Sequence, residues 1–172
     1  KHETGSTMRA RIIIPTYNRP EVVKRAVDSI PLGYPIYIVR RPGRETDVAK
    51  ITKEFHDVAS SVHSAASWAD GAEEAIANGA EYLLFMDDEC VLDRYTFEEL
   101  ALSFSINNEF GVTGVLGDLK KHYNVHVRPR FFERPILGVC FMTPTTVYKE
   151  VGGIDKTMDV GEDTDYCLRT LI

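Results

Sequence analysis

Three consecutive acids follow an apolar run in the segment YLLFMDDECVLD, residues 82–93. Two carboxylates about 4 Å apart repel each other by roughly 1 kcal/mol in water, and by more in a drier site. A turn that needed only to be solvated could use Asn, Gly or Ser instead. Asp87, Asp88 and Glu89 therefore indicate either a partner cation or a raised pKa, unless the segment is simply an acidic turn in water.

Oxygen ligands of this kind suit a divalent metal ion. Mg²⁺ and Mn²⁺ prefer carboxylate oxygens and often bind a substrate diphosphate at the same time. If the strand continues through the acids, Asp87 and Glu89 project in similar directions, whereas Asp88 points away from them. The position of the acids in the fold decides between a metal site and a solvated turn.

A second acidic cluster lies in GEDTDYCLR, residues 161–169. Glu162 and Asp163 would begin a helix, where the N-terminal dipole stabilises negative charge, and capping would account for one of them. A carboxylate there could also take a proton from an attacking hydroxyl, because a general base needs only hydrogen-bond reach and an ionised state. A charged helix start is the alternative explanation.

Alternating strands and helices are expected to position these acids. In the first half, the apolar patterns predict strands at residues 9–15, 34–40, 60–65 and 81–86, separated by helices over residues 20–30, 46–59 and 68–79. This alternation favours right-handed crossovers on a parallel sheet, whose ligands bind beyond the carboxyl ends of the strands. The loop PTYN after the first strand and the acids after the fourth should therefore open on the same edge and could share a site.

The second half is less regular. A helix is expected over residues 95–106, a strand over 111–117, a basic extended segment over 120–135, a strand over 136–144, a short helix over 145–155 and a further helix from residue 162. In the first half, the helix over residues 46–59 would turn Val48, Ile51 and Phe55 toward the core.

The bulk composition is that of one globular domain. The 172 residues are 44% hydrophobic and 27% charged, which argues against wholesale disorder, and the net charge of -6 gives no general reason to expect a polyanionic partner. No apolar run approaches the roughly 20 residues that span a bilayer, and the first ten residues lack the apolar core of a signal peptide, so we expect a cytoplasmic protein without a transmembrane segment. Residues 1–7, ahead of Met8, are interpreted as a vector-derived leader. Cys90, Cys140 and Cys167 fit reduced intracellular thiols.

Three segments resemble, in the right order, three sequence blocks of the family 2 glycosyltransferases: IIIPTYNRPEVVKRAVDSI, EYLLFMDDECVLD and VGGIDKTMDVGEDTDYCLR. These are inverting enzymes on the GT-A fold, and the match runs from about residue 11 to the end of the chain. The resemblance implies an α/β chain with a Rossmann-like, mostly parallel central sheet and helices on both faces. It also implies one GT-A domain, with a nucleotide-binding half over about residues 8–93 and an acceptor-side half over about residues 94–172.

By this resemblance the chain moves a sugar from a nucleoside diphosphate sugar, with UDP as the expected nucleotide, to a hydroxyl of a glycan, lipid-linked sugar or protein. The nucleotide pocket would be lined by residues from several strand ends: Pro15, Thr16, Tyr17, Arg19, Arg40, Asp87 and Asp88. The three acids would be the family's DxD-type motif, in which Asp87 and Glu89 hold Mn²⁺ or Mg²⁺ and the metal offsets charge on the leaving nucleotide. Asp163 would deprotonate the acceptor hydroxyl, with Glu162 beside it placing the acceptor.

Two segments depart from the family pattern. After the second strand the family has an Asp-Asp-Gly-Ser type stretch with an acid that contacts the base, whereas this chain has VRRPGRETD, residues 39–47. Arg40, Arg41 and Arg44 cannot accept hydrogen bonds, so they alter base recognition, contact phosphate or are solvated surface residues. The Asn and Arg that often stand near the start of the third helix are replaced in residues 68–71, which read WADG.

The basic segment KKHYNVHVRPRFFERP, residues 120–135, mixes basic and aromatic side chains. Such a mixture can hold a nucleic-acid strand by phosphate contact and stacking. An irregular loop on the acceptor side is the favoured interpretation, and a nucleic-acid acceptor is the less favoured one. His122 and His126 share a strand face and could bind a metal, but the sequence offers no third ligand.

Two other functions stay open. A sugar-nucleotide pyrophosphorylase also uses Mg²⁺ on a similar sheet, but it would need a glycine-rich loop after the first strand, and PTYNRP contains no glycine. A nucleotide-binding module without transferase activity would fit the missing acid after the second strand. Donor hydrolysis or sugar transfer would exclude the module.

Overall fold

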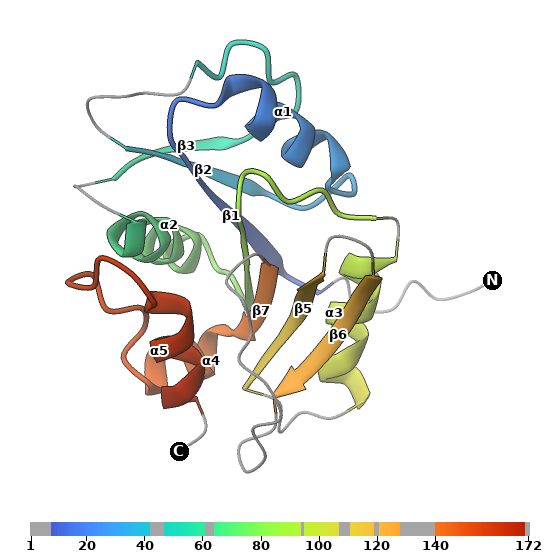
Figure 1. The fold of residues 1–172 in the computed structure, drawn as a ribbon, viewed down its shortest axis with the longest axis vertical. Coiled ribbons are helices and arrows are strands. Elements are labelled where there is room, and N and C mark those ends of the chain that lie inside the picture. Colours follow the sequence, from blue (N-terminus) through green and yellow to red (C-terminus); the bar gives the residue numbers. More distant parts are fainter. Residues whose placement is uncertain are drawn as a thin grey trace.

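A computed structural model describes residues 8–41, 47–60, 64–93, 95–106, 111–118, 121–127 and 140–170. Within these ranges a seven-stranded sheet forms the centre of the chain, in the strand order β3-β2-β1-β4-β7-β5-β6 (Figure 1). The strands are β1 (Ala10–Thr16), β2 (Ile36–Arg40), β3 (His56–Ala59), β4 (Tyr82–Met86), β5 (Val112–Asp118), β6 (Lys121–Val127) and β7 (Cys140–Pro144). The helices are α1 (Pro20–Ser29), α2 (Ser64–Ala77), α3 (Thr96–Ile106), α4 (Thr145–Glu150) and α5 (Glu162–Arg169).

The four strands β3, β2, β1 and β4 run parallel to one another. β1 is rich in β-branched residues and is buried along both faces, as expected for a central parallel strand. Its register places Thr16 beside Arg40 of β2 and Ile13 beside Phe85 of β4. The carboxyl ends of β1, β2 and β4 therefore lie along one edge of the sheet.

Helices cover both faces of this sheet. Side chains of α1 and α3 share one core with Ile12 of β1, and side chains of α2, α4 and α5 share the other with Ile13 and Phe85. α2 comes close to the sheet because Gly71 stands where a Cβ atom would lie 2.6 Å from Ile13 Cγ2 and 2.7 Å from Val39 Cγ2. The predicted mostly parallel sheet with helices on both faces is confirmed.

The remaining strands extend the sheet in alternating directions. β7 pairs antiparallel with β4, β5 pairs antiparallel with β7, and β6 pairs antiparallel with β5. α4 follows β7 directly and lies beside α5, with the rings of Tyr148 and Tyr166 centred 5.6 Å apart (Figure 1). β7 thereby carries the two C-terminal helices next to β4.

The predicted helix over residues 46–59 and the strand over 60–65 are wrong. Residues 56–59 form β3, which pairs with β2, while Ser64 already belongs to α2. The segment before β3 runs across the end of α1, because the ammonium of Lys53 donates to the carbonyls of Val27 and Ile30 at 2.9 and 2.6 Å. The segment before β3 therefore contacts α1 instead of forming a helix of its own. The predicted inward side chains Val48, Ile51 and Phe55 still pack against the core.

Several predictions fall on residues outside the described ranges. These are the leader at residues 1–7, Arg44, and residues 128–135 of the basic segment. β6 accounts for the first part of that segment, as predicted for an extended conformation. Among the described helices, none combines the length and the hydrophobicity needed to cross a membrane.

Candidate active site

The loops after β1 and β4 meet through a buried hydrogen bond. Thr16, the last residue of β1, donates its hydroxyl to Oδ2 of Asp88 at 2.9 Å. Thr16 is 2% exposed and Asp88 is 1% exposed, so this contact is shielded from water. The prediction that the two loops open on the same edge of the sheet is therefore confirmed.

Arg19 supplies a cation to the acidic turn. Its Nε donates to Oδ2 of Asp88 at 3.2 Å, its Nη2 forms an ion pair with Oδ1, and its Nη1 donates to Oε2 of Glu89 at 3.2 Å. β4 ends before the acids, and the N–H of Cys90 closes a turn onto the Asp87 carbonyl at 3.0 Å. The strand therefore does not continue through the acids, as the predicted alternation of their directions required, and Asp88 and Glu89 both reach one guanidinium.

Asp87, the first acid of the turn, has a raised pKa. Burial, followed by the charges of Asp88, Glu89 and Asp163, raises the pKa of Asp87 to about 7 against the opposing effect of Arg19. Burial also raises the pKa of Asp88, although its hydrogen-bond partners oppose that shift. The turn thus has both features that the sequence indicated as alternatives, a partner cation and a raised pKa.

Asp163 acts on this turn from the start of α5. Gly161 precedes the helix with φ 82°, a left-handed conformation that glycine adopts without strain. Glu162 is 9% exposed and Asp163 is half-buried in the first turn. Since Asp163 contributes to the raised pKa of Asp87, the structure brings the predicted base within electrostatic range of the acids after β4.

A buried tyrosine anchors α5 to the sheet. The hydroxyl of Tyr166 lies 2.8 Å from Oγ1 of Thr143 in β7, and that hydroxyl of Thr143 also donates to the Gly111 carbonyl at 2.8 Å. The ring of Tyr166 stacks on Phe141 of β7 with centroids 6.0 Å apart. Burial raises the pKa of Tyr166, which therefore stays protonated. These contacts fix α5 one turn after its acidic start.

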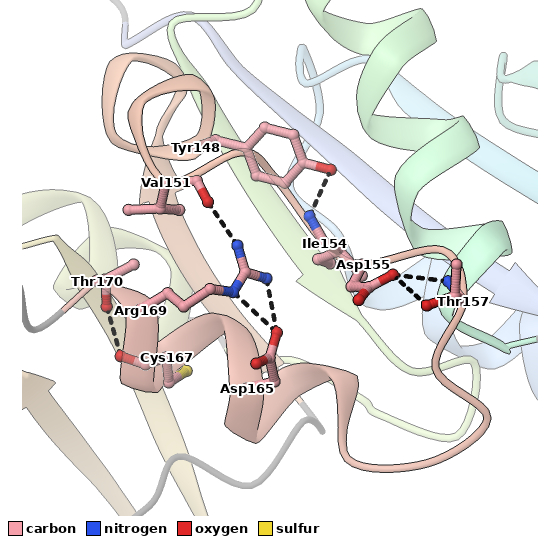
Figure 2. A network of polar contacts seen from close by, with 9 residues as sticks. All are labelled: Tyr148, Val151, Ile154, Asp155, Thr157, Asp165, Cys167, Arg169 and Thr170. Carbon is pink, nitrogen blue, oxygen red and sulfur yellow. Dashed lines mark hydrogen bonds and ion pairs between the residues drawn. The ribbon is translucent and has the colours of Figure 1, made fainter.

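Arg169 ties the other end of α5 to α4 (Figure 2). Its Nε donates to Oδ2 of Asp165 at 2.9 Å, and its Nη1 donates to the Val151 carbonyl at 2.5 Å, just beyond the end of α4. The N–H of Gly153 donates to the Tyr148 carbonyl at 2.8 Å, which closes α4. The last turn of α5 is therefore held to the end of α4.

Lys156 connects that loop to α2. Its ammonium donates to Oδ1 of Asp70 at 2.9 Å and forms an ion pair with Glu73 at 2.8 Å. Oδ2 of Asp70 accepts a hydrogen bond from Ser60, directly after β3, at 3.1 Å. No sequence pattern marks Lys156, although Asp70 lies in the segment that departs from the family pattern.

The predicted nucleotide side chains at β1 and β2 have different surroundings. Tyr17 is 39% exposed, and the guanidinium carbon of Arg41 lies 5.4 Å from the centre of its ring. Arg40 instead binds Asp57 of β3, with Nε donating to Oδ1 at 2.6 Å and Nη2 paired with Oδ2. Pro15 lies in β1 beside Val39 of β2. Asp57 is an acid near the end of the second strand that sequence reasoning missed.

The acids after β4 suit a divalent cation that binds both these carboxylates and a diphosphate. Asp87 and Glu89 offer hard oxygen ligands, and the charges of Asp88 and Glu89 add to burial in raising the pKa of Asp87. In the part of the chain that the structure describes, no three His, Cys, Asp or Glu side chains gather to hold a metal by themselves. The side chains of His122 and His126 lie outside the described part of the structure, so their predicted metal site is not tested. A metal at Asp87 and Glu89 would take further ligands from its substrate.

Solved structures share this fold, whereas no protein-family model and no curated protein matches the chain. TarS of S. aureus, as its fragment 1–349, superposes with a TM-score of 0.69 at 13% identity, covering 95% of this chain and 55% of that one. The mannosyltransferase PcManGT from Pyrobaculum calidifontis, in complex with GDP-Man and Mn²⁺, gives a TM-score of 0.65 at 17% identity, covering 92% of this chain and 50% of that one.

The same TarS fragment in complex with UDP-GlcNAc gives a TM-score of 0.65 at 14% identity, covering 95% of this chain and 53% of that one. These neighbours are glycosyltransferases of the GT-A type. The predicted GT-A fold is therefore confirmed. The chain spans about half the length of the solved structures it matches.

Proposed function

We propose that this chain transfers a sugar from a nucleoside diphosphate sugar to an acceptor hydroxyl with inversion at the anomeric carbon, as a member of glycosyltransferase family 2. One observation carries the proposal. Burial chiefly raises the pKa of Asp87 just after β4, and the charge of Asp163 at the start of α5 adds to that shift, so a carboxylate from the acceptor-side half stands near the acidic turn of the nucleotide half. The shared fold with glycosyltransferases supports sugar transfer from a nucleotide sugar.

Asp163 is the proposed general base. It is half-buried, so part of the side chain faces solvent, where an acceptor hydroxyl could approach and give up its proton. Glu162 beside it would orient the acceptor. The anchors at Tyr166 and Arg169 hold the helix that carries both acids, which suits a base that must keep its position between turnovers.

We assign donor binding to the residues at and after the carboxyl ends of β1 and β4. Pro15, Thr16 and Tyr17 would line the nucleotide pocket with Arg19, and Asp87 and Asp88 would border the ribose and diphosphate. Arg40 is retained only as a second contact, because Asp57 already binds its guanidinium. UDP is the first nucleotide to test and GDP the second, since the structural neighbours were determined with UDP-GlcNAc and GDP-Man.

A divalent ion is part of the proposal. Asp87 and Glu89 would hold Mn²⁺ or Mg²⁺ together with the donor diphosphate, and PcManGT was determined with Mn²⁺. The ion would offset the charge that develops on the leaving nucleoside diphosphate. The acceptor stays a prediction at the level of chemistry: a hydroxyl of a glycan, a lipid-linked sugar or a protein, with nucleic acid less favoured. The cytoplasmic location also stays a prediction.

A nucleotide-binding module without transferase activity is the second candidate. The ion pair of Arg40 with Asp57 favours it, because this pair occupies the end of β2 where the family pattern has an acid free to contact the base. A pyrophosphorylase is less favoured, because residues 17–19 after β1 are Tyr, Asn and Arg and offer no glycine-rich loop to triphosphate.

Thermal unfolding with UDP and GDP, each with Mn²⁺ or with a chelator, tests the donor site. A ligand that binds only the folded chain stabilises it by about 2.7 kcal/mol at a hundredfold excess over Kd. We expect a Mn²⁺-dependent rise in Tm with one of the two nucleotides and loss of that rise in Glu89→Ala. The matched control is Glu54→Ala, another exposed acid far along the chain from the site. No rise with either nucleotide would contradict the proposal.

A further inference from the structure

The guanidinium of Arg19 divides its contacts between two unequal acids. Two of its nitrogens, Nε and Nη2, contact the carboxylate of Asp88, whereas only Nη1 reaches Glu89 at 3.2 Å. The Asp88 side chain is 0% exposed, while those of Arg19 and Glu89 are 47% and 63% exposed. One guanidinium thus makes a shielded contact and a solvated contact at the same time.

These two contacts differ in how easily they break. Removing the partner of a buried carboxylate leaves an uncompensated charge in a dry site, which strongly destabilises a protein. An exposed ion pair loses little when it breaks, because water and dissolved ions replace the partner. We therefore expect the contact between Arg19 and Asp88 to persist and the contact between Nη1 and Glu89 to exchange.

The charges around the turn favour such an exchange. Burial raises the pKa of Asp87, the charges of Asp88, Glu89 and Asp163 raise it further, and Arg19 is the cation that opposes them. A divalent ion that binds Asp87 and Glu89 would remove Glu89 from Nη1. The released N–H of Arg19 would then point into a site that receives a diphosphate, and guanidinium groups bind phosphate oxygens well.

We propose that Arg19 is an exchange partner within the donor site. In the free protein, Glu89 accepts a hydrogen bond from Nη1 of Arg19. When donor and metal bind, Glu89 binds the metal instead and Nη1 donates to the donor diphosphate. The ion pair between Asp88 and the same guanidinium is kept throughout. The exchange rests on the proposed function and deepens it, because it assigns Arg19 and Glu89 coupled roles. Arg19 then weakens metal binding in the absence of donor and strengthens binding of the diphosphate.

Binding of Mn²⁺ alone and of UDP and GDP in the presence of a chelator tests this exchange without turnover. In Glu89→Gln, Nη1 is released from a charged partner, so the better-bound nucleotide should bind without metal about tenfold more tightly, while Mn²⁺ alone binds more weakly. In Arg19→Gln the signs reverse: Mn²⁺ alone should bind several-fold more tightly and the nucleotide more weakly. Calorimetry reports the nucleotide, and electron paramagnetic resonance reports free Mn²⁺.

A double variant separates the exchange from simple loss of a negative charge. If Nη1 carries the effect, the tenfold gain of Glu89→Gln should disappear in the Arg19→Gln background. Glu21→Gln is the matched control, because it removes an exposed carboxylate from the first turn of α1 and should change neither affinity. Arg19→Lys guards against a folding defect, because its ammonium keeps a positive charge beside Asp88 but lacks the planar fork of donors that a guanidinium presents to a diphosphate.

The outcomes distinguish this inference from the proposed function. If the wild-type chain binds neither nucleotide with or without Mn²⁺, the donor site itself is contradicted and the exchange with it. If the wild type binds nucleotide but the gain of Glu89→Gln persists without Arg19, only the exchange is overturned. It is also overturned if folded Arg19→Gln and Arg19→Lys weaken Mn²⁺ and nucleotide together, since that pattern indicates a purely structural arginine.

Discussion

Asp163 at the start of α5 lies close enough to Asp87 at the end of β4 to raise the pKa of the Asp87 carboxyl. The two residues come from opposite halves of the chain. β7 brings them together, because it pairs with β4 and leads directly into the two C-terminal helices. A parallel sheet alone would leave the acids after β4 without a facing carboxylate.

The raised pKa of Asp87 predicts how stability depends on pH in metal-free buffer. Burial and neighbouring charge raise this pKa from 3.8 to about 7, so the folded state favours the protonated carboxyl. Its stabilising contribution is complete below about pH 4 and is lost as the pH rises through 7. Asp87→Asn removes this loss, so the variant should be more stable than the wild type at pH 8 and nearly equal to it at pH 4.

Thermal unfolding of both proteins between pH 4 and 8, in the presence of a chelator, measures this difference. The advantage in Tm at pH 8 should amount to several degrees, since each unit of pKa shift corresponds to about 1.4 kcal/mol. Glu54→Gln serves as the control, because it removes an exposed carboxylate from a segment that follows β2 rather than from the acidic turn. An advantage of Asp87→Asn that is equally large at pH 4 would contradict the role of ionisation.

The sequence predicted the parts of this site that depend on neighbouring residues in the chain. Apolar patterns located β1 and β4, and the rule for parallel strands placed their loops on one edge, which the bond from Thr16 to Asp88 confirms. The alternating directions expected for the three acids required the strand to continue through them, and β4 ends at Met86 instead. The helix over residues 46–59 failed because its apolar spacing also suits a segment that packs across the end of α1.

The ion pairs that the sequence did not predict join residues that are far apart in the chain. Arg19 and Asp88 are 69 residues apart, and Lys156 and Asp70 are 86 residues apart, so no local pattern marks either pair. Arg40 was predicted to contact nucleotide, and only the register of β3 beside β2 reveals Asp57 as its partner. The roles assigned to the site residues stay predictions that the following variants test.

Tyr166→Phe should loosen the attachment of α5. The substitution removes the hydroxyl that lies 2.8 Å from Thr143 Oγ1 and keeps the ring that stacks on Phe141. Loss of one buried hydrogen bond should lower the free energy of unfolding by about 1 kcal/mol. Denaturant titration measures the loss, and a stability equal to the wild type would show that this bond contributes nothing to α5.

Lys156→Gln should impair turnover more than donor binding. The ammonium ties the loop before α5 to Asp70 and Glu73 of α2, so its loss should let the acidic start of α5 move relative to the donor. We expect kcat to fall roughly three- to tenfold, as a small misplacement of a reacting group can cause. The Kd for UDP or GDP should stay within about twofold.

Lys149→Gln is the control for this variant, because Lys149 is an exposed lysine in the last turn of the neighbouring helix α4. If both lysine variants lose turnover equally, the bridge to α2 has no specific role. A fall in donor affinity with unchanged kcat would place the effect of Lys156 on nucleotide binding instead.

The product should have the opposite anomeric configuration to the donor. A base that activates the acceptor hydroxyl for direct attack opposite the leaving diphosphate inverts the anomeric carbon in one step. When water accepts the sugar, the product is a free sugar whose anomers interconvert slowly. Proton NMR of the sugar first released from UDP-GlcNAc or GDP-Man, before this equilibration, resolves the two anomers. A product that retains the configuration would contradict the assignment of Asp163 as base.

The most direct test compares turnover and donor binding in Asp163→Asn. Release of nucleoside diphosphate from the accepted donor should fall by at least about a hundredfold, since general bases typically contribute that much or more. The Kd for UDP or GDP with Mn²⁺ should stay within about threefold, and Asp159→Asn, an exposed acid in the preceding loop, should keep wild-type turnover. Wild-type turnover in Asp163→Asn would contradict the central claim that this carboxylate is the catalytic base.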